Sequence, residues 1–263
     1  SAVAEALGAP GLERRSETWR EAPFDGTADL APLRARLQID LNILPAVGRS
    51  KSILIADMDS TMLPVECIDE LADFAGVKPQ VSEITERAMR GELDFEQAID
   101  ARVALLRDLP EAALAQCYAE RVHLNPGAAT LVQTMNAGGA RTALVSGGFT
   151  FFTERVAQVA GFQSHQANVL LVQDGKLTGA VQKPVLGQQA KADALAALCD
   201  ERAAEASDVL ALGDGANDLA MIRAAGLGVA YRAKPALRAE ANAILDHSDL
   251  SAVLALQGIP AKT

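Results

Sequence analysis

The sequence predicts an α/β fold in which a doubly wound parallel sheet carries an inserted group of helices. Short, continuously apolar runs recur along the chain, segments with helical spacing separate them, and a long helical interval follows the first run. A strand that is covered by helices on both faces has no solvent side, so its residues are apolar without alternation. Alternation of such strands with helices is typical of a parallel sheet.

The same patterns place the individual strands and helices. The expected strands are the apolar runs Ile53–Ala56, Thr142–Val145, Val169–Val172, Val209–Leu212 and Leu227–Ala230. The expected helices are Gly127–Ala137, Phe149–Val159, Gln188–Arg202 and Asn217–Ala225. The dipeptide Asp174-Gly175 predicts a hairpin turn, so a small β excursion is expected between Val169 and Val181.

The interval after the first strand predicts a separate helical insert. Residues 63–125 contain apolar positions at helical spacing, and this is too much chain for one crossover helix. We interpret 63–125 as a helical cap above the carboxyl edge of the sheet, and residues 51–62 and 126–263 as the core domain. Residues 1–50 form an N-terminal extension of unassigned role, with one expected helix near Asp29–Gln38.

Composition limits the kinds of partner that the chain can bind. The chain has 263 residues and a formal net charge of -10, which argues against sequence-independent binding to nucleic acid or anionic membranes. Its three cysteines are widely spaced and lack a CxxC pair, which favours a reducing compartment. No apolar run is long enough to cross a membrane and no signal peptide is visible, so a cytoplasmic protein is expected. The oligomeric state has no signal in the sequence.

Polar residues follow three of the expected strands at the points where the strands end. These segments are Asp57-Met58-Asp59-Ser60-Thr61, Ser146-Gly147-Gly148 and Gly213-Asp214-Gly215-Ala216-Asn217-Asp218. Ligands of open α/β sheets bind beyond the carboxyl ends of the strands, so the three segments are expected to meet. The carboxylates would repel one another unless a cation lay between them, and Mg²⁺ prefers such carboxylates together with water and phosphate oxygens.

The glycines of the second segment add a cradle for an anion. Without side chains, Gly147 and Gly148 let backbone N–H groups approach a ligand closely, just where a helix is expected to begin. Each short motif occurs often by chance, whereas three of them in this order at strand ends form a specific pattern. Together they predict a site for an anion and a divalent metal ion.

These segments, together with Lys191, resemble the four motifs of the haloacid dehalogenase superfamily, and more narrowly those of its phosphoserine phosphatases. The resemblance extends from about Lys51 to Leu256, close to four-fifths of the chain. It implies a Rossmannoid sheet and magnesium-dependent hydrolysis of a small phosphate monoester, L-phosphoserine, in serine biosynthesis. Glu66, and Phe95-Glu96-Gln97 leading to Arg102, support the narrower match.

The resemblance also implies a chemical role for the motif residues. Asp57 would attack phosphorus and form an aspartyl-phosphate, and Asp59 would protonate the leaving oxygen and then activate water. Asp59 must be protonated for the first step, so we expect surroundings that raise its pKa. Ser146, the Gly147 N–H and Lys191 would bind the phosphate oxygens as charge shifts in the transition state.

The resemblance implies metal and substrate ligands as well. The implied Mg²⁺ ligands are the Asp57 and Asp214 carboxylates, the Asp59 backbone carbonyl, and Asp218 directly or through water. At the amino-acid end of the substrate, Glu66 would take the ammonium and Arg102 would hold the carboxylate in bidentate fashion. By the same resemblance, Met89 and Phe95 would line the substrate pocket, and Asn217 would lie near the phosphate.

Several residues also have ordinary structural interpretations. Lys191 lies in a helix-forming stretch where a surface lysine is common, Ser146 could cap the helix that follows, and Glu66 and Arg102 could be surface charges. Met89 and Phe95 could be core residues of the helical insert.

The alternative functions are an enzyme of the same type that acts on another small phosphate monoester such as phosphohomoserine, or one that transfers the phosphate to an acceptor alcohol. A regulatory protein that keeps the fold without the chemistry is disfavoured by the intact acidic motifs. The chain contains no GxxxxGK[ST] motif of the P-loop enzymes.

Overall fold

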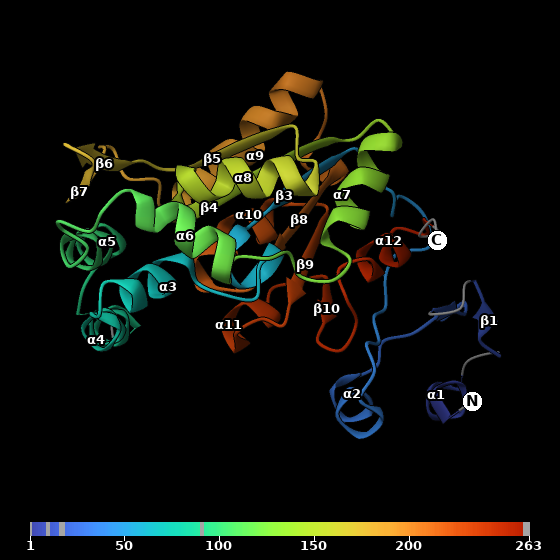
Figure 1. Ribbon diagram of the computed structural model, residues 1–263. Helices are drawn as coiled ribbons and strands as arrows, with labels where there is room; N and C mark the ends of the chain where they lie inside the picture. The colour runs from blue at the N-terminus through green and yellow to red at the C-terminus, as the bar shows by residue number, and fades with distance from the viewer. Residues whose placement is uncertain (1, 9–10, 16–18, 90–91, 260–263) are drawn as a thin grey trace.

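The computed structural model describes residues 2–8, 11–15, 19–89 and 92–259, and its centre is a six-stranded parallel sheet (Figure 1). In spatial order the strands are β10 (Ala243–Leu245), β9 (Leu227–Tyr231), β8 (Val209–Gly213), β3 (Ile53–Ala56), β4 (Arg141–Phe149) and β5 (Ser164–Asn168). The first of these strands in the sequence, β3, lies between β4 and β8, so the chain turns outward in both directions from β3. Such a switch point is where open α/β sheets bind ligands.

The register of the three central strands brings their carboxyl ends to one level. Ala56 pairs with Leu144 of β4 and with Leu212 of β8. The residues that follow these partners therefore leave the sheet at the same edge. The prediction of a doubly wound parallel sheet is confirmed, and so is the expectation that the three polar segments meet.

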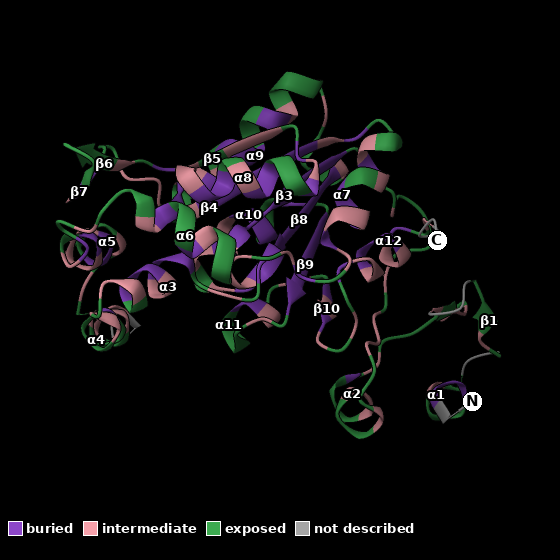
Figure 2. Ribbon diagram, viewed as in Figure 1, coloured by how far each residue is buried: buried purple, intermediate pink, exposed green. Residues whose placement is uncertain are grey.

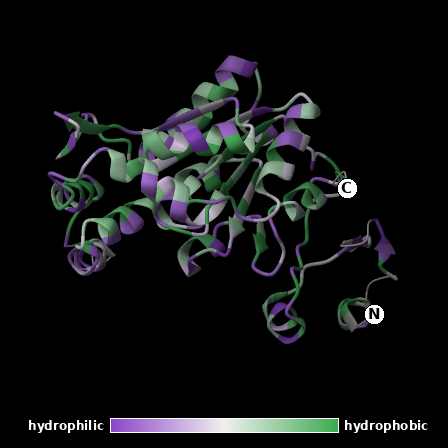
Figure 3. Ribbon diagram, viewed as in Figure 1, coloured by the Kyte–Doolittle hydropathy of each residue, from purple (hydrophilic) through white to green (hydrophobic). Residues whose placement is uncertain are grey.

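Helices cover both faces of the sheet. One face packs against α7 (Ala128–Ala137), α8 (Thr150–Ala160) and α12 (Ala252–Leu256), and the other packs against α9 (Gln188–Arg202), α10 (Leu219–Ala224) and α11 (Pro235–Arg238). Within β3, Leu54 belongs to the first core and Ile55 to the second, because successive side chains point to opposite faces. Figure 2 shows the buried residues concentrated in the central strands, and Figure 3 shows the same strands as hydrophobic.

Four α-helices of the described residues lie between β3 and α7 in the sequence. They are α3 (Cys67–Phe74), α4 (Lys78–Met89), α5 (Phe95–Ala104) and α6 (Ala112–Arg121). In Figure 1 they gather beyond one end of the sheet. Helix α5 starts with a capping box, in which the Asp94 carboxylate accepts a hydrogen bond from the Gln97 N–H and the Gln97 side chain accepts one from the Asp94 N–H. This box fixes the helix start directly before Phe95.

The segment Val169–Val172 differs from its prediction as a buried strand. Strand β6 (Leu170–Gln173) pairs antiparallel with β7 (Lys176–Val181) in a separate two-stranded sheet, and most of its residues are exposed. The turn between them has positive φ at both Asp174 and Gly175, so the predicted hairpin is confirmed. A two-stranded ribbon is covered on one side at most. The apolar composition of 169–172 therefore did not indicate a strand buried on both faces.

Two strands of the main sheet were not predicted. Strand β5 lies at the edge of the sheet and has a polar sequence, and β10 is only three residues long. Strand β4 continues to Phe149, beyond the predicted end at Val145. The helix predicted at 217–225 is divided into a short 3₁₀ turn and α10.

The N-terminal segment contains α1 (Ala2–Leu7), β1 (Glu13–Arg14), β2 (Arg20–Glu21) and α2 (Ala31–Leu37), the last of which matches the predicted helix. After α2, the Asn42 amide accepts a hydrogen bond from the Ile244 N–H at 2.9 Å and donates one to the Ile244 carbonyl at 3.0 Å. It thereby pairs with the free edge of β10. Within the described part of the chain, no helix has the length and apolar character needed to cross a membrane.

Candidate active site

Asp57 directly follows β3, at the carboxyl end of this buried strand. Its N–H still donates to the Leu212 carbonyl at 2.9 Å, so the residue is held by the pairing of β3 with β8. The chain then turns sharply, with a left-handed backbone at Ser60. The turn keeps Asp57 buried while Asp59, two residues on, reaches a different part of the site.

Lys191 is buried and binds two of the carboxylates. Its ammonium donates to Asp57 Oδ1, and to Asp218 Oδ1 at 2.5 Å. Burial disfavours the charged amine, but the nearby Asp218 and Asp57 carboxylates outweigh that effect and raise the pKa of Lys191. A fully buried lysine needs such partners, so the interpretation of Lys191 as a surface residue is wrong.

The segment after β8 completes a cluster of three carboxylates. Oxygens of Asp57, Asp214 and Asp218 all lie within 4.8 Å of one another. The Asp218 Oδ2 accepts the Asp214 and Gly215 N–H groups, each at 3.1 Å, so the loop is folded around this side chain. A methyl group at Gly213 would overlap the Asp218 side chain, and this close approach accounts for the glycine. This set of hard oxygen donors fits a divalent cation.

Asp214 has the most solvent-accessible carboxylate of the three, yet its pKa is raised to about 6 by burial and by the Asp218 charge. The Thr61 hydroxyl donates to its Oδ1 at 3.3 Å and acts in the opposite direction. Burial, together with the Asp218 charge, therefore outweighs the opposing effects of the Thr61 hydrogen bond and the Lys191 charge on the pKa of Asp214.

The Asp59 side chain does not belong to the three-carboxylate cluster and binds other groups. Its Oδ1 accepts the Cys67 N–H at 2.9 Å, and its Oδ2 accepts the Ser146 hydroxyl at 3.1 Å. Burial raises the pKa of Asp59, in the direction expected from the sequence. Only its backbone carbonyl is left as a candidate metal ligand, and that role stays a prediction.

The Ser146-Gly147-Gly148 loop is a bulge between β4 and β5. Val145 pairs with Gln166 and Phe149 pairs with Asn168, so β4 has three residues where β5 has one. The extra residues project at the edge of the sheet. The Ser146 hydroxyl accepts the Gly148 N–H at 2.8 Å and donates to Asp59, and a methyl group at Gly148 would lie 2.6 Å from Asp59 Oδ2.

Two opposite charges from the segment between β3 and α7, Glu66 and Arg102, lie within electrostatic reach of Asp59. Glu66 accepts a hydrogen bond from the Ser60 hydroxyl at 2.6 Å. Although Glu66 keeps an exposed face, burial and the Asp59 charge raise its pKa to about 7. Burial lowers the pKa of Arg102 on α5, and it outweighs the negative charges of Glu66 and Asp69, which raise that pKa. The Arg102 Nε donates to the Ala98 carbonyl at 3.2 Å.

The remaining predicted lining residues differ in what the structure shows. The Phe95 ring lies against two backbone segments. A methyl group built on Gly147 would lie 3.1 Å from the ring, and one built on Gly187 would lie 3.3 Å from it. Asn217 lies in the 3₁₀ turn that carries Asp218, with its side chain against Gly215. The side chain of Met89 lies outside the described residues.

With this geometry established, comparison with known proteins decides the family. The family model of the haloacid dehalogenase-like hydrolases matches residues 54–223, which contain both carboxylate segments, the glycine loop and Lys191. The chain belongs to the haloacid dehalogenase-like hydrolase family.

Curated relatives within this family are phosphoserine phosphatases. The relative from Vibrio cholerae is 45% identical over 204 residues, which cover 78% of this chain and 62% of the relative. The relative from Haemophilus influenzae is 45% identical over 216 residues, which cover 82% of this chain and 68% of the relative. The chain thus spans less than two thirds of the length of the Vibrio cholerae relative.

A solved structure described as a phospho-aspartyl intermediate analogue of phosphoserine phosphatase is also similar. It is 37% identical with a TM-score of 0.73, and the match covers 80% of this chain and 100% of the other.

Two polar residues of this haloacid dehalogenase-like hydrolase site were missed in the sequence. Asn125, between α6 and α7, donates its N–H to the Met62 carbonyl and its side-chain amide to the Thr61 carbonyl, each at 2.8 Å. Asn168 binds the backbone of the glycine loop. Neither residue belongs to a short motif. Their roles could have been predicted only with knowledge of which segments lie side by side in the fold.

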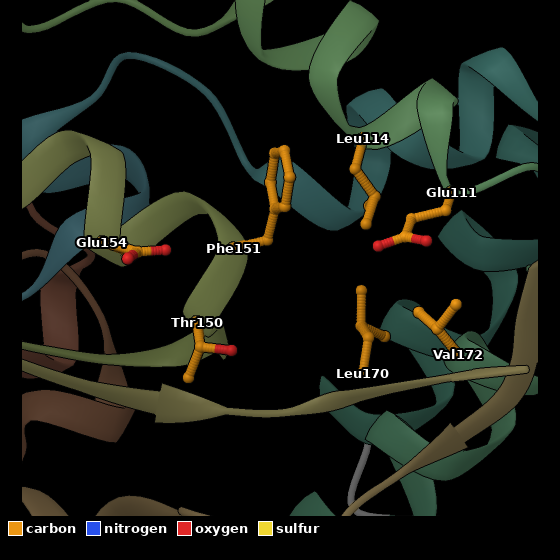
Figure 4. Close-up of a pocket in the computed structure, with 7 residues that line it drawn as sticks. All are labelled: Glu111, Leu114, Thr150, Phe151, Glu154, Leu170 and Val172. Atoms are coloured by element: carbon orange, nitrogen blue, oxygen red, sulfur yellow. The ribbon is translucent and has the colours of Figure 1, made fainter. Parts of the chain in front are cut away.

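A cavity of about 190 Å³ lies apart from these residues, between α6, α8 and β6. Figure 4 shows Leu114 and Phe151 on one side of it, with Leu170 and Val172 on the other. None of the predicted site residues lines this cavity. The carboxylate cluster is therefore the better supported site, because its set of oxygen donors is chemically specific, whereas the cavity has a mixed lining of apolar and polar side chains.

Proposed function

We propose that the chain hydrolyses O-phospho-L-serine to L-serine and phosphate through an aspartyl-phosphate on Asp57, as a step of serine biosynthesis. One observation carries this proposal above the others. Asp57 is buried as a member of the carboxylate cluster bound by Lys191, and Asp59, two residues on, is paired with the Ser146 hydroxyl. That arrangement supplies a nucleophile, a proton donor and positive charge within one site.

In the first step, a carboxylate oxygen of Asp57 forms a bond to phosphorus while the bond to the serine oxygen breaks. Asp59 gives its proton to the departing oxygen, and its raised pKa keeps that proton available. The Lys191 ammonium and the Ser146 hydroxyl stabilise the charge on the phosphoryl oxygens, together with backbone N–H groups of the glycine loop.

In the second step, Asp59 is a carboxylate and takes a proton from water. The resulting nucleophile attacks phosphorus, the bond to the Asp57 oxygen breaks, and inorganic phosphate leaves. Asp59 can act first as acid and then as base because its side chain binds the Ser146 hydroxyl and is not part of the carboxylate cluster.

Mg²⁺ fits the carboxylates that Lys191 leaves uncompensated. The ammonium balances one of the three clustered charges, and the two that remain match one divalent cation. Asp57, Asp214 and Asp218 would hold the ion, with the Asp59 backbone carbonyl as a further ligand. When bound, the ion lowers the repulsion between the Asp57 carboxylate and the phosphate dianion.

We assign the amino-acid end of the substrate to the helical insert, residues 63–125, acting as a cap over the core at 51–62 and 126–263. Glu66 offers a carboxylate to the ammonium, and Arg102 offers a guanidinium to the carboxylate. The electrostatic effect of Glu66 on Arg102 supports a shared site for these two charges. Phe95 closes the cap against the glycine loop and excludes water during the first transfer.

The test is phosphate release from a panel of phosphate monoesters, with and without Mg²⁺, for the wild type and Asp57→Asn. We expect metal-dependent hydrolysis of L-phosphoserine that the variant lacks. Faster turnover of phosphohomoserine or transfer to an alcohol would keep the mechanism and overturn the substrate. No hydrolysis of any ester with Mg²⁺ present would overturn the proposed function as a whole.

A further inference from the structure

Asn168, the last residue of β5, connects two backbone segments of the site. Its side-chain amide donates to the Gly147 carbonyl at 2.9 Å and to the Leu186 carbonyl at 3.3 Å. Its side-chain oxygen accepts the Leu186 N–H at 2.7 Å. The residue is 3% exposed, so water does not replace these bonds. Asn168 thus ties the glycine loop to the segment that enters α9.

The bond to Gly147 controls the orientation of one peptide unit. The Gly147 carbonyl and the Gly148 N–H belong to the same planar group and point in opposite directions. Fixing the carbonyl therefore fixes the N–H, which donates to the Ser146 hydroxyl oxygen at 2.8 Å. A hydroxyl has one hydrogen, and Ser146 donates it to Asp59. A continuous series of hydrogen bonds thus joins Asn168 to the proposed general acid.

The bonds to Leu186 control the start of α9. Leu186 precedes Gly187, the N-cap of that helix, and Lys191 lies in its first turns. Holding Leu186 by both its N–H and its carbonyl therefore sets the position from which Lys191 reaches Asp57. The same two segments hold the Phe95 ring between Gly147 and Gly187.

We propose that Asn168 is a positioning residue for phosphoryl transfer: it fixes the glycine loop and the Lys191 helix in one relative geometry. This inference rests on the proposed function only for the reaction that is measured. Asn168 acts through Ser146 and Lys191, which stabilise the transition state. Among the described residues, no contact joins it to Glu66 or Arg102, the proposed ligands of the substrate's ammonium and carboxylate. Its loss therefore lowers kcat more than it changes KM.

Asn136 provides a matched control at the opposite end of β4. Its amide donates to the Gly161 carbonyl at 2.6 Å and accepts the Thr142 hydroxyl at 2.8 Å. It also joins separate backbone and side-chain groups of the core, yet it contacts no part of the glycine loop. A variant there reports the cost of losing a bridging amide without any effect on the site.

The experiment compares Asn168→Ala and Asn168→Asp with Asn136→Ala and Asn136→Asp in the full chain. Asn168→Asp keeps an acceptor for the Leu186 N–H but places an oxygen against the Gly147 carbonyl, so it remains informative should the alanine variant fail to fold. We expect kcat for L-phosphoserine to fall about 10- to 100-fold in both Asn168 variants, with KM within about threefold. The Asn136 variants should keep kcat within about twofold while losing a similar amount of thermal stability.

Binding of orthovanadate with Mg²⁺ separates this inference from the proposed function. Orthovanadate mimics the five-coordinate phosphorus of the transition state, so its affinity should fall with kcat in the Asn168 variants and not in the Asn136 variants. If the wild type hydrolyses another ester, the same comparison applies to that ester, and if it hydrolyses none, orthovanadate affinity decides. Unchanged kcat and orthovanadate affinity in a folded Asn168 variant, or equal losses in the Asn136 variants, would overturn the assignment.

Discussion

Lys191 donates a hydrogen bond to Asp57, and both side chains are almost completely buried. The second acceptor of the ammonium, Asp218, is buried as well. An ammonium in this position does two things at once. It makes the clustered carboxylates tolerable in the folded protein, and it places a positive charge beside the proposed nucleophile.

Replacing Lys191 should therefore lower both stability and activity. Lys191→Ala leaves buried carboxylates without their cation, which costs about 3–5 kcal/mol in the free energy of unfolding. Lys183→Ala is the matched control, because that ammonium also bridges two carboxylates, Glu96 and Asp100, but on the exposed surface. Its loss should change the free energy of unfolding far less, because water screens exposed charges. Urea unfolding measures both, and equal losses would contradict the role given to burial.

Phe95 needs glycine at two places in the core. A methyl group at Gly187 would lie 3.3 Å from the ring, and Gly187 has an ordinary negative φ, so alanine there strains no backbone. Gly187→Ala should displace the ring and α5, which lowers kcat/KM for L-phosphoserine by roughly tenfold. Gly11→Ala has no neighbour within 4 Å and serves as the control. Wild-type kcat/KM in Gly187→Ala would show that Phe95 does not close over the site.

Glu66 should make substrate binding depend on pH near neutrality. Burial and the Asp59 charge raise its pKa from the ordinary 4.5 to about 7. The contribution of Glu66 to the stability of the free protein is therefore fully present below about pH 4.5 and is lost as the pH rises through about 7. The substrate ammonium favours the ionised form. KM for L-phosphoserine should therefore fall by roughly three- to tenfold as the pH rises through about 7.

The measurement is KM from about pH 5.5 to 8.5 for the wild type and Glu66→Gln, with an aryl phosphate as reference substrate. The reference corrects for ionisation of the phosphate itself. An identical pH dependence in Glu66→Gln would remove Glu66 from ammonium binding.

Arg102 should select for substrates that carry a carboxylate. Arg102→Leu removes the guanidinium but keeps part of the aliphatic stem, and we expect kcat/KM for L-phosphoserine to fall about 10- to 100-fold. Turnover of an aryl phosphate should change by less than about threefold. Arg107→Leu, an exposed arginine one turn further on, is the control. A comparable loss for both substrates in Arg102→Leu would assign this residue to cap structure instead.

The sequence was sufficient to predict the centre of the sheet because β3 and β8 are buried on both faces. Continuous apolar runs such as Ile53–Ala56 are typical of strands that helices cover on both sides, and the polar residues at their ends could be assigned to one edge. The edge strand β5 was missed for the same physical reason. It is an edge strand in which only Asn168 is buried, so its sequence is polar and carries no buried-strand signal.

The orientations of side chains within the site could not be predicted from spacing. Asp57 and Asp59 are two residues apart, yet the left-handed backbone at Ser60 and the bulge at Ser146 direct Asp59 to the hydroxyl rather than to the cluster. Lys191 could be assigned by resemblance only, because its burial depends on where α9 packs. Asn168 was missed because its partners are distant in the sequence.

The most direct test of the account is to trap the covalent intermediate. The wild type is mixed with radiolabelled L-phosphoserine and Mg²⁺, quenched in acid within milliseconds, and digested for peptide mapping. We expect label on the peptide that contains Asp57, removable by hydroxylamine and absent from Asp57→Asn. Steady hydrolysis without labelled protein, or label on another residue, would contradict the claim that Asp57 is the nucleophile.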